Sequence, residues 1–169
     1  MDTQEYEQRQ TTLQKAMRDW LLRGQANAFI TLTFRSEDGV SFSYGEKAFG
    51  AFIHDLKCKL FGEKSKKRLF VVPVIEGYVL AKHEPNRTHI HILVKFPGDP
   101  LNYKEVVRRS WMASSRLSGD PLVYDPSNKQ WFKDISDQEL CRIETNYVLK
   151  TCAIDTEAIL WKYVPKLDA

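Results

Sequence analysis

The stretch "NRTHIHILVKF", residues 86 to 96, constrains the fold of this chain more than any other. Its run of β-branched and apolar residues predicts a β-strand. Side chains of a strand alternate between two faces, so His89 and His91 point one way while Ile90, Ile92 and Val94 point the other. The sequence therefore predicts a sheet with a hydrophobic core on one face and two neighbouring imidazoles on the opposite face.

Helical and extended patterns alternate along the rest of the chain. Apolar spacing predicts helices over about 3–23, 44–61, 102–117 and 136–153, with a last short helix within 155–163. Strands are predicted at 28–34, on each side of a polar loop at 81–87, and at 130–135. Ser43 and Ser136 are the expected N-caps of the second and fourth helices, since a glutamate follows each of them three residues later. Pro73 implies a bulge or an unpaired amide in the strand that precedes the loop.

This order of elements predicts an α+β fold, a central antiparallel sheet flanked by helices. No glycine-rich strand-to-helix turn is present, which disfavours a nucleotide-binding α/β fold. The 169 residues suit a single domain, with a helical extension at 1–27, a core at 28–153 and a C-terminal helix or tail at 154–169. No apolar run approaches the roughly 20 residues of a membrane span, and three cysteines without metal-ligand spacing favour the cytoplasm.

The basic residues are unevenly distributed, although the net charge is only +3. Residues 57–68, "KCKLFGEKSKKR", hold six bases and one acid, Glu63. Residues 82–118 hold seven bases and three acids. These segments bracket the histidine strand, as expected for a surface that binds a polyanion. Solvated loop and helix surfaces explain the same charges equally well.

The two histidines are spaced to bind one divalent ion. Glu76 ends the apolar run "VVPVIEG", and an antiparallel hairpin would bring its carboxylate across from His89 and His91. Two imidazoles and a carboxylate suit Mn²⁺ or Mg²⁺, and Zn²⁺ less specifically. The alternative is a pair of hydrogen-bonded surface histidines without an ion.

The helix at 136–153 carries a candidate nucleophile. Leu140, Ile143, Tyr147 and Ile154 share one helical face, and Lys150 lies at its edge. A tyrosine close to a cation and a metal can act as a nucleophile, because both charges favour the phenolate. Alternatively, Tyr147 belongs to the core and Lys150 extends to water.

Three separated motifs occur in the order found in a known superfamily. "ITLTF" (30–34), "HIH" (89–91) and "YVLK" (147–150), with "VIE" (74–76) on the preceding strand, resemble the motifs of the HUH endonucleases. The similarity is to rolling-circle replication initiators, the Rep proteins of small plasmids and single-stranded DNA viruses, and it spans about residues 28–151. Threonine at position 151 replaces the second tyrosine of the phage-type initiators, so the chain resembles the one-tyrosine enzymes.

The resemblance implies a ferredoxin- or RRM-like core and metal-dependent nicking and joining of single-stranded DNA through a 5′-phosphotyrosine. It assigns the metal to Glu76, His89 and His91, the nucleophile to Tyr147, and an assisting role to Lys150. The remaining positions that we expect to contact DNA are Thr31, Thr33, Lys66, Lys67, Arg68, Arg87, Arg108 and Arg109. The implied partners are an origin hairpin and a host helicase and polymerase.

Three other functions remain open at this stage. A one-tyrosine transposase or relaxase would share the same chemistry. A DNA-binding regulator on the same fold would not cleave, and a metal hydrolase would cleave without a tyrosine intermediate.

Overall fold

The computed structural model describes residues 3–79, 87–123, 130–154 and 156–166. It has an α+β fold built on one four-stranded antiparallel sheet of order β2-β3-β1-β4. The strands are β1 (Ala28–Thr33), β2 (Phe70–Glu76), β3 (His89–Lys95) and β4 (Phe132–Asp134). The helices are α1 (Thr3–Arg23), α2 (Phe42–Phe61), α3 (Lys104–Ser114) and α4 (Gln138–Ile154), with short 3-10 turns at Pro100–Tyr103, Thr156–Ala158 and Trp161–Tyr163. From β1 to β4 the chain order is β-α-β-β-α-β, the ferredoxin-like arrangement.

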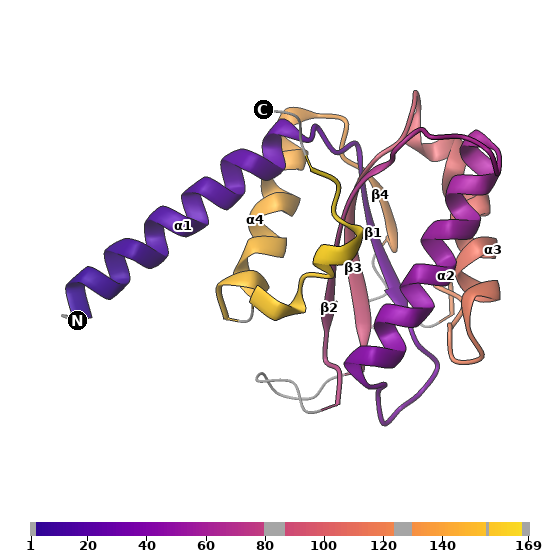
Figure 1. Ribbon diagram of the computed structural model, residues 1–169, viewed down its shortest axis with the longest axis horizontal. Coiled ribbons are helices and arrows are strands. Elements are labelled where there is room, and N and C mark those ends of the chain that lie inside the picture. Colours follow the sequence, from indigo (N-terminus) through magenta and orange to yellow (C-terminus); the bar gives the residue numbers. More distant parts are fainter. Residues whose placement is uncertain (1–2, 80–86, 124–129, 155, 167–169) are drawn as a thin grey trace.

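Helices cover both faces of the sheet (Figure 1). Helices α2 and α3 pack on one face, while α4 lies on the other beside the end of α1, whose N-terminal part extends away from the rest of the molecule. Among the described residues, no helix combines the length and the apolar character that crossing a membrane requires.

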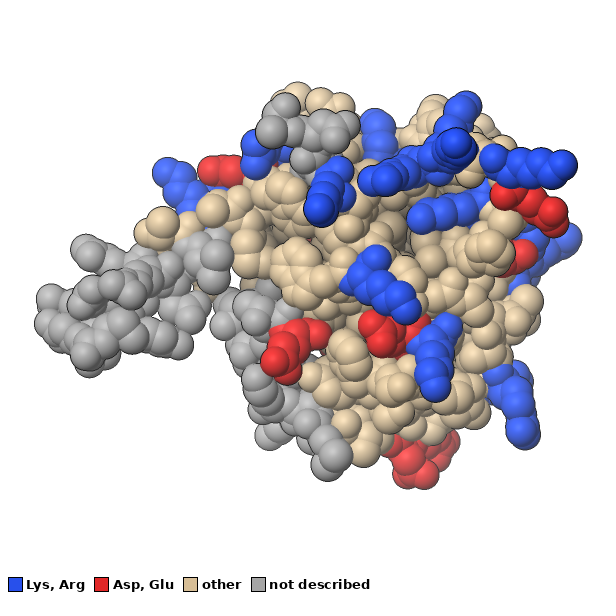
Figure 2. All heavy atoms as spheres, viewed as in Figure 1, with Lys and Arg blue, Asp and Glu red and all other residues tan. Residues whose placement is uncertain are grey.

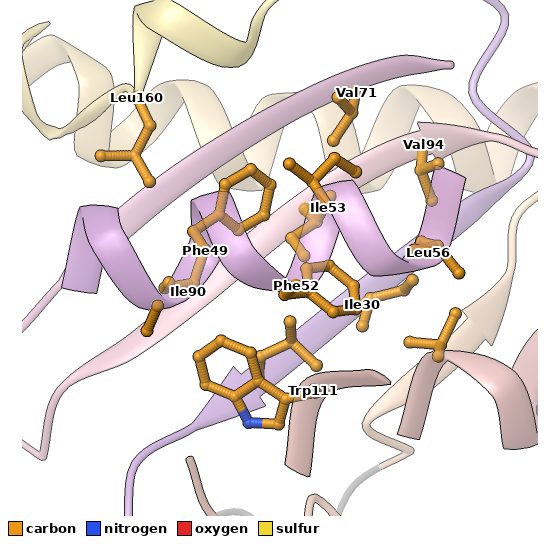
Figure 3. Packing of buried hydrophobic residues seen from close by; sticks show 14 of the residues in the cluster. Ile30, Phe49, Phe52, Ile53, Leu56, Val71, Ile90, Val94, Trp111 and Leu160 are labelled. Carbon is orange, nitrogen blue, oxygen red and sulfur yellow. The ribbon is translucent and has the colours of Figure 1, made fainter. Parts of the chain in front are cut away.

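The larger core lies between the sheet and helices α2 and α3. Phe49, Phe52 and Leu56 of α2 pack on the strand residues that alternation assigns to this face, Ile30 and Ile90 among them (Figure 3). Trp111 of α3 is fully buried and donates its indole N–H to the carbonyl of Thr33 at 3.0 Å. A buried Trp in this position is stable because its one polar atom has a partner. The predicted division of the strand at 89–95 into two faces is confirmed for Ile90, Ile92 and Val94.

The opposite face carries a second, smaller core. Phe29, Val72, Val74 and Leu93 from the sheet pack against Cys141, Val148 and Leu149 of α4, against Leu21 of α1 and against Ala158 and Ile159. The histidine face is therefore also a core face over part of its length. The two histidines lie on this same face, at the end of β3 where the strand begins.

Two of the predicted helix boundaries are wrong. The N-cap of α2 is Ser41, whose hydroxyl accepts from the Tyr44 amide, rather than Ser43. The N-cap carboxylate of α4 belongs to Asp137, which accepts from the amides of Glu139 and Leu140, whereas Ser136 bonds to Asp134. In both cases a neighbouring side chain of equally good capping chemistry competes, and backbone geometry decides between them.

Pro73 causes no bulge. The pairing of β2 with β3 runs without interruption from Phe70–Lys95 to Glu76–His89, and Pro73 lies opposite Ile92. The Pro73 carbonyl faces away from β3 and accepts from the Leu160 amide at 3.0 Å. Since the amide and carbonyl of one residue point the same way in an antiparallel strand, the missing N–H also faces away from β3. Proline is thus tolerated because β2 is the edge strand. The short helix expected within 155–163 is two 3-10 turns, apart from residue 155, which lies outside the described residues.

Candidate metal centre

The hairpin register brings the predicted metal ligands together. Glu76 is directly opposite His89, and Thr31 of β1 is directly opposite His91 on the other side of β3. Directly opposed residues in a sheet share a face, so all four side chains emerge on the α4 side of the sheet. The antiparallel pairing predicted from the sequence is therefore what forms the site.

Glu76, His89 and His91 form a compact group, called here the Glu–His–His cluster. Glu76 Oε2 lies 3.1 Å from His89 Nε2 and 3.6 Å from His91 Nε2. One potential ligand atom from each of the three residues lies within 4.8 Å of the other two. Ligands of a common ion at about 2.1 Å are separated by no more than about 4.2 Å, so the cluster is close to coordinating geometry without an ion.

Both imidazole rings are held by hydrogen bonds through the nitrogen that faces away from the cluster. His89 Nδ1 donates to the Arg87 carbonyl at 2.8 Å, and a carbonyl only accepts, so the proton is on Nδ1. His91 Nδ1 lies 3.0 Å from Thr31 Oγ1. Such partners orient metal-binding histidines and select the tautomer whose Nε2 is free to bind. Thr31, which we expected near DNA, is placed here as the partner of a potential metal ligand.

Burial and neighbouring charges act differently on the two histidines. Burial by itself would lower the pKa of His89, but its hydrogen bonds to Glu76 and to the Arg87 carbonyl outweigh burial and raise that pKa above the ordinary value of 6.5. Burial, then the charge of His89 and, more weakly, that of Lys133, lower the pKa of His91 far below 6.5. Without a metal, the surroundings therefore favour a proton on His89, where Glu76 can accept it in a hydrogen bond, and they favour the neutral form of His91.

An unpartnered buried atom supports a ligand at this position. His91 Nε2 is buried and makes no hydrogen bond to any described residue, since Glu76 Oε2 at 3.6 Å is too far away. A buried polar atom without a partner costs about 1–3 kcal/mol unless water or an ion satisfies it. The donor set of two imidazoles and one carboxylate fits a divalent cation and leaves other coordination positions open. The structure thus contains a possible metal site, and these residues fit the cofactor that the sequence predicts.

Tyr147 of α4 lies beside the cluster. Its ring centroid is 5.2 Å from that of His91 and 6.1 Å from that of Phe29, in edge-to-face contacts. The residue is about half exposed, at 49%. The alternative, in which Tyr147 belongs to a buried stripe of this helix, is not supported: Leu140 and Ile143 are also about half exposed, and α4 buries Cys141, Thr145, Val148 and Leu149 instead. Tyr147 is therefore accessible to a ligand rather than part of the core.

The ionisation of Tyr147 differs from the sequence-based argument. Burial of the ring, then the negative charges of Glu76 and Glu144, raise the pKa of the Tyr147 phenol above its ordinary value of 10. Without a bound cation the surroundings thus favour the phenol over the phenolate. Lys150 is exposed on α4, three residues beyond Tyr147.

Sequence reasoning missed Lys133 and Glu144. Lys133 of β4 is opposite Phe29 of β1 and so emerges on the cluster face. Its Nζ lies 5.5 Å from the centre of the Phe29 ring and forms an ion pair of 2.8 Å with Glu144 Oε1. The alternation of "QWFKDI" indicates that Lys133 and Phe132 point to opposite faces, but the sequence does not show that β4 is the neighbour of β1.

The expected DNA-contacting residues are dispersed. Arg87 is close to the cluster, with its Nε bonded to the Phe34 carbonyl at 3.2 Å. Arg108 and Arg109 belong to α3 on the opposite face of the sheet. Arg108 forms an ion pair with Asp120, and the two arginines each form an ion pair with Glu105. Thr33 shares the cluster face, but it is only 1% exposed, so that DNA could reach its hydroxyl only after the chain moved.

The remaining three, Lys66, Lys67 and Arg68, are exposed in the segment that precedes β2. They lie at the end of β2 that is far from Glu76. The structure therefore brings together the predicted metal ligands and Tyr147, and it does not bring this basic run to them.

Comparison with known proteins adds no relative: no protein-family profile, no curated protein and no solved structure matches the chain. What the site can do therefore follows from its own geometry and from the motifs described above.

Proposed function

We propose that this protein is a metal-dependent endonuclease of the HUH type, which nicks and rejoins single-stranded DNA through a 5′-phosphotyrosine. The observation that carries the proposal is the half-exposed Tyr147 ring at 5.2 Å from the ring of His91, beside three clustered potential metal ligands. The three clustered residues would be expected of any metal site. An accessible phenol beside them, that of Tyr147, is what a mechanism with a tyrosine nucleophile specifically requires. The three motifs, the "VIE" segment on the preceding strand and the ferredoxin-like order of elements agree with the same proposal.

Glu76, His89 and His91 would hold a Mn²⁺ or Mg²⁺ ion. When bound, the ion supplies Lewis-acid polarisation of a phosphate oxygen and positive charge beside Tyr147. Thr31 and the Arg87 carbonyl fix the imidazole rings, so that little reorganisation is needed when the ligands engage. The added positive charge also offsets Glu76, one of the two carboxylates that raise the pKa of Tyr147.

In the proposed reaction Tyr147 is the nucleophile. Its oxygen forms a bond to the phosphorus as the bond from phosphorus to the 3′ oxygen breaks. The phenol proton passes to solvent, and the departing 3′ oxygen takes up a proton to become a free hydroxyl. Attack of a 3′-hydroxyl on the phosphotyrosine reverses these steps and joins the strand. Lys150, exposed one turn beyond Tyr147, is the residue that we assign to positioning the phosphate.

For the biological role we propose initiation of rolling-circle replication of a plasmid or viral genome in the cytoplasm or wherever that genome is copied. The 3′-hydroxyl would prime a host polymerase, a host helicase would separate the strands, and an origin hairpin would present the single strand. A one-tyrosine transposase or relaxase would use the same site on a different DNA.

The test is incubation with circular single-stranded DNA and Mn²⁺, followed by a denaturing gel. The proposal predicts linear DNA that migrates with covalently attached protein, and neither product in EDTA or with His89→Ala. Linear DNA without attached protein would indicate a metal hydrolase. Intact DNA bound in a non-denaturing gel, with no cleavage of any single-stranded sequence, would indicate a non-cleaving regulator.

A further inference from the structure

Most charges of residues 57–68, called here the basic segment, are not compensated. Lys59 forms an ion pair of 2.7 Å with Asp55. Within the part of the chain that the structure describes, the other five bases form no ion pair; they are Lys57, Lys64, Lys66, Lys67 and Arg68. The last four are exposed. Burial lowers the pKa of Lys57, and the nearby charge of Arg68 lowers it further. Uncompensated positive charges that are close together in one segment attract a polyanion.

The basic segment lies at the opposite end of the sheet from the Glu–His–His cluster. It leads from α2 into β2, which begins at Phe70 opposite Lys95 and ends at Glu76 opposite His89. Six residue steps of about 3.3 Å separate the two ends by about 20 Å. Figure 2 shows the basic side chains gathered over the end of α2 and the segment that follows it.

The chemistry of the segment favours the phosphates of a duplex over the bases of a single strand. Surfaces that bind single strands combine basic residues with exposed aromatic rings on which bases stack. The one aromatic residue of the segment, Phe61, packs against the larger core, and Lys67 Nζ lies 6.0 Å from the centre of its ring. Exposed lysines without a stacking ring act as point charges for a regular phosphate array.

We propose that the basic segment is a second DNA-binding surface, which binds the phosphates of duplex DNA about six base pairs from the nicking site, at about 3.4 Å per base pair. This inference rests on the proposed function, because it takes the metal centre as the place where the strand is cut. It revises the expectation that Lys66, Lys67 and Arg68 contact the single strand. The surface would set which duplex arm of an origin the protein binds, whereas the cluster acts on the single strand beside it.

The experiment is fluorescence anisotropy in EDTA, where binding is measured without cleavage. The probes are a labelled duplex of about 20 base pairs and a single strand of about 8 nucleotides, each titrated at several salt concentrations between about 50 and 200 mM. The test variant is Lys66→Glu/Lys67→Glu/Arg68→Glu. The matched control is Lys15→Glu/Lys47→Glu/Lys162→Glu, which reverses three exposed bases outside the segment and changes the net charge equally.

The test variant should lose duplex affinity, and the slope of log K against log salt should become shallower by about 2.7, which is about 0.9 for each of three lost phosphate contacts. The control should keep a slope close to that of the wild type, and both variants should bind the short single strand as the wild type does. An unchanged slope in the test variant, or an equal loss in the control, would overturn the inference.

Two further outcomes would replace duplex DNA by another ligand. If the test variant loses the short single strand as strongly as the duplex, the segment belongs to the single-strand site. If the wild type binds phosphatidylserine vesicles more tightly than the duplex and the test variant loses only the vesicles, the ligand is an anionic membrane surface. Because no cleavage is needed, a failure of the nicking proposal would leave these binding results interpretable on their own.

Discussion

The hydrogen bond between Thr31 and His91 allows a sharp test of the metal site. Metal binding through His91 Nε2 requires the ring proton on Nδ1, where it is donated to Thr31 Oγ1 at 3.0 Å. Thr31→Val replaces the hydroxyl by a methyl of the same shape, so it removes this acceptor and leaves a buried N–H without a partner. The register of β1 with β3 and the packing of the sheet face should be unchanged.

The expected magnitude follows from the role of such partners. Loss of a hydrogen bond that orients a metal ligand typically lowers metal affinity about tenfold to a hundredfold, or about 1.4–2.7 kcal/mol. The free energy of unfolding of the metal-free protein should fall by about 1–3 kcal/mol, because the buried ring N–H of His91 is left without a partner.

Thr33→Val is the matched control. Thr33 is on the same strand and the same face, opposite His89, and its buried hydroxyl has no hydrogen-bond partner among the described residues. Its replacement should leave Mn²⁺ affinity within about twofold of the wild type. It should leave the free energy of unfolding unchanged or slightly raised, since it removes an unsatisfied polar group. Calorimetric titration with Mn²⁺ measures the affinities, and urea unfolding measures stability. Equal Mn²⁺ affinity in Thr31→Val and the wild type would refute the reasoning, as would equal losses in both variants.

Three further predictions follow from the site. Below the raised pKa of His89 a proton occupies the nitrogen that would bind Mn²⁺, so Mn²⁺ affinity should fall by about tenfold per pH unit there, and binding should release about one proton. Titration calorimetry in two buffers of different ionisation enthalpy would detect the released proton. Binding without proton release below that pKa would exclude His89 as a ligand. Lys133→Met removes the 2.8 Å ion-pair partner of Glu144, whose side chain is only 12% exposed, and should lower the free energy of unfolding in urea by about 1–2 kcal/mol. The double variant Lys133→Met/Glu144→Gln should recover most of this loss. No recovery would show that the two residues are not coupled. His91→Ala should abolish Mn²⁺ binding and also lower the free energy of unfolding by about 1–3 kcal/mol, because the ring, which is 5% exposed, packs against Phe29. His89→Ala should destabilise the fold less, because the His89 side chain is more exposed. Equal stability losses in the two variants would contradict this difference.

The sequence predicted the sheet and the Glu–His–His cluster because both depend on period-two patterns. Alternation at 89–95 placed His89 and His91 on one face, and the hairpin placed Glu76 on that face, directly opposite His89. These inferences need only the pairing of two strands that are close in sequence. The fold class follows in the same way from the order of elements.

Features that depend on contacts between distant segments were not predicted. Leu140, Ile143 and Tyr147 have the spacing of a core stripe and are nevertheless about half exposed, whereas the interface that α4 makes uses smaller or polar residues such as Cys141 and Thr145. Helical periodicity reveals an apolar face, but it does not reveal whether another element covers that face. The place of Lys133 beside the cluster depends in the same way on β4 pairing with β1, a choice that no local pattern specifies.

The central claim is that Tyr147 attacks DNA, and the most direct measurement is the identity of the residue that carries the covalent adduct. Wild type and Tyr147→Phe are incubated with single-stranded origin DNA and Mn²⁺, digested with nuclease and protease, and analysed by mass spectrometry. Tyr103→Phe is the control, because it also loses one hydroxyl, which donates to the Pro97 carbonyl just beyond the end of β3 that is opposite to His89. The account predicts a nucleotide attached to Tyr147 in the wild type and in the control, and no adduct in Tyr147→Phe, which should still bind Mn²⁺ and DNA. An adduct on any other tyrosine, or one that persists in Tyr147→Phe, would contradict it.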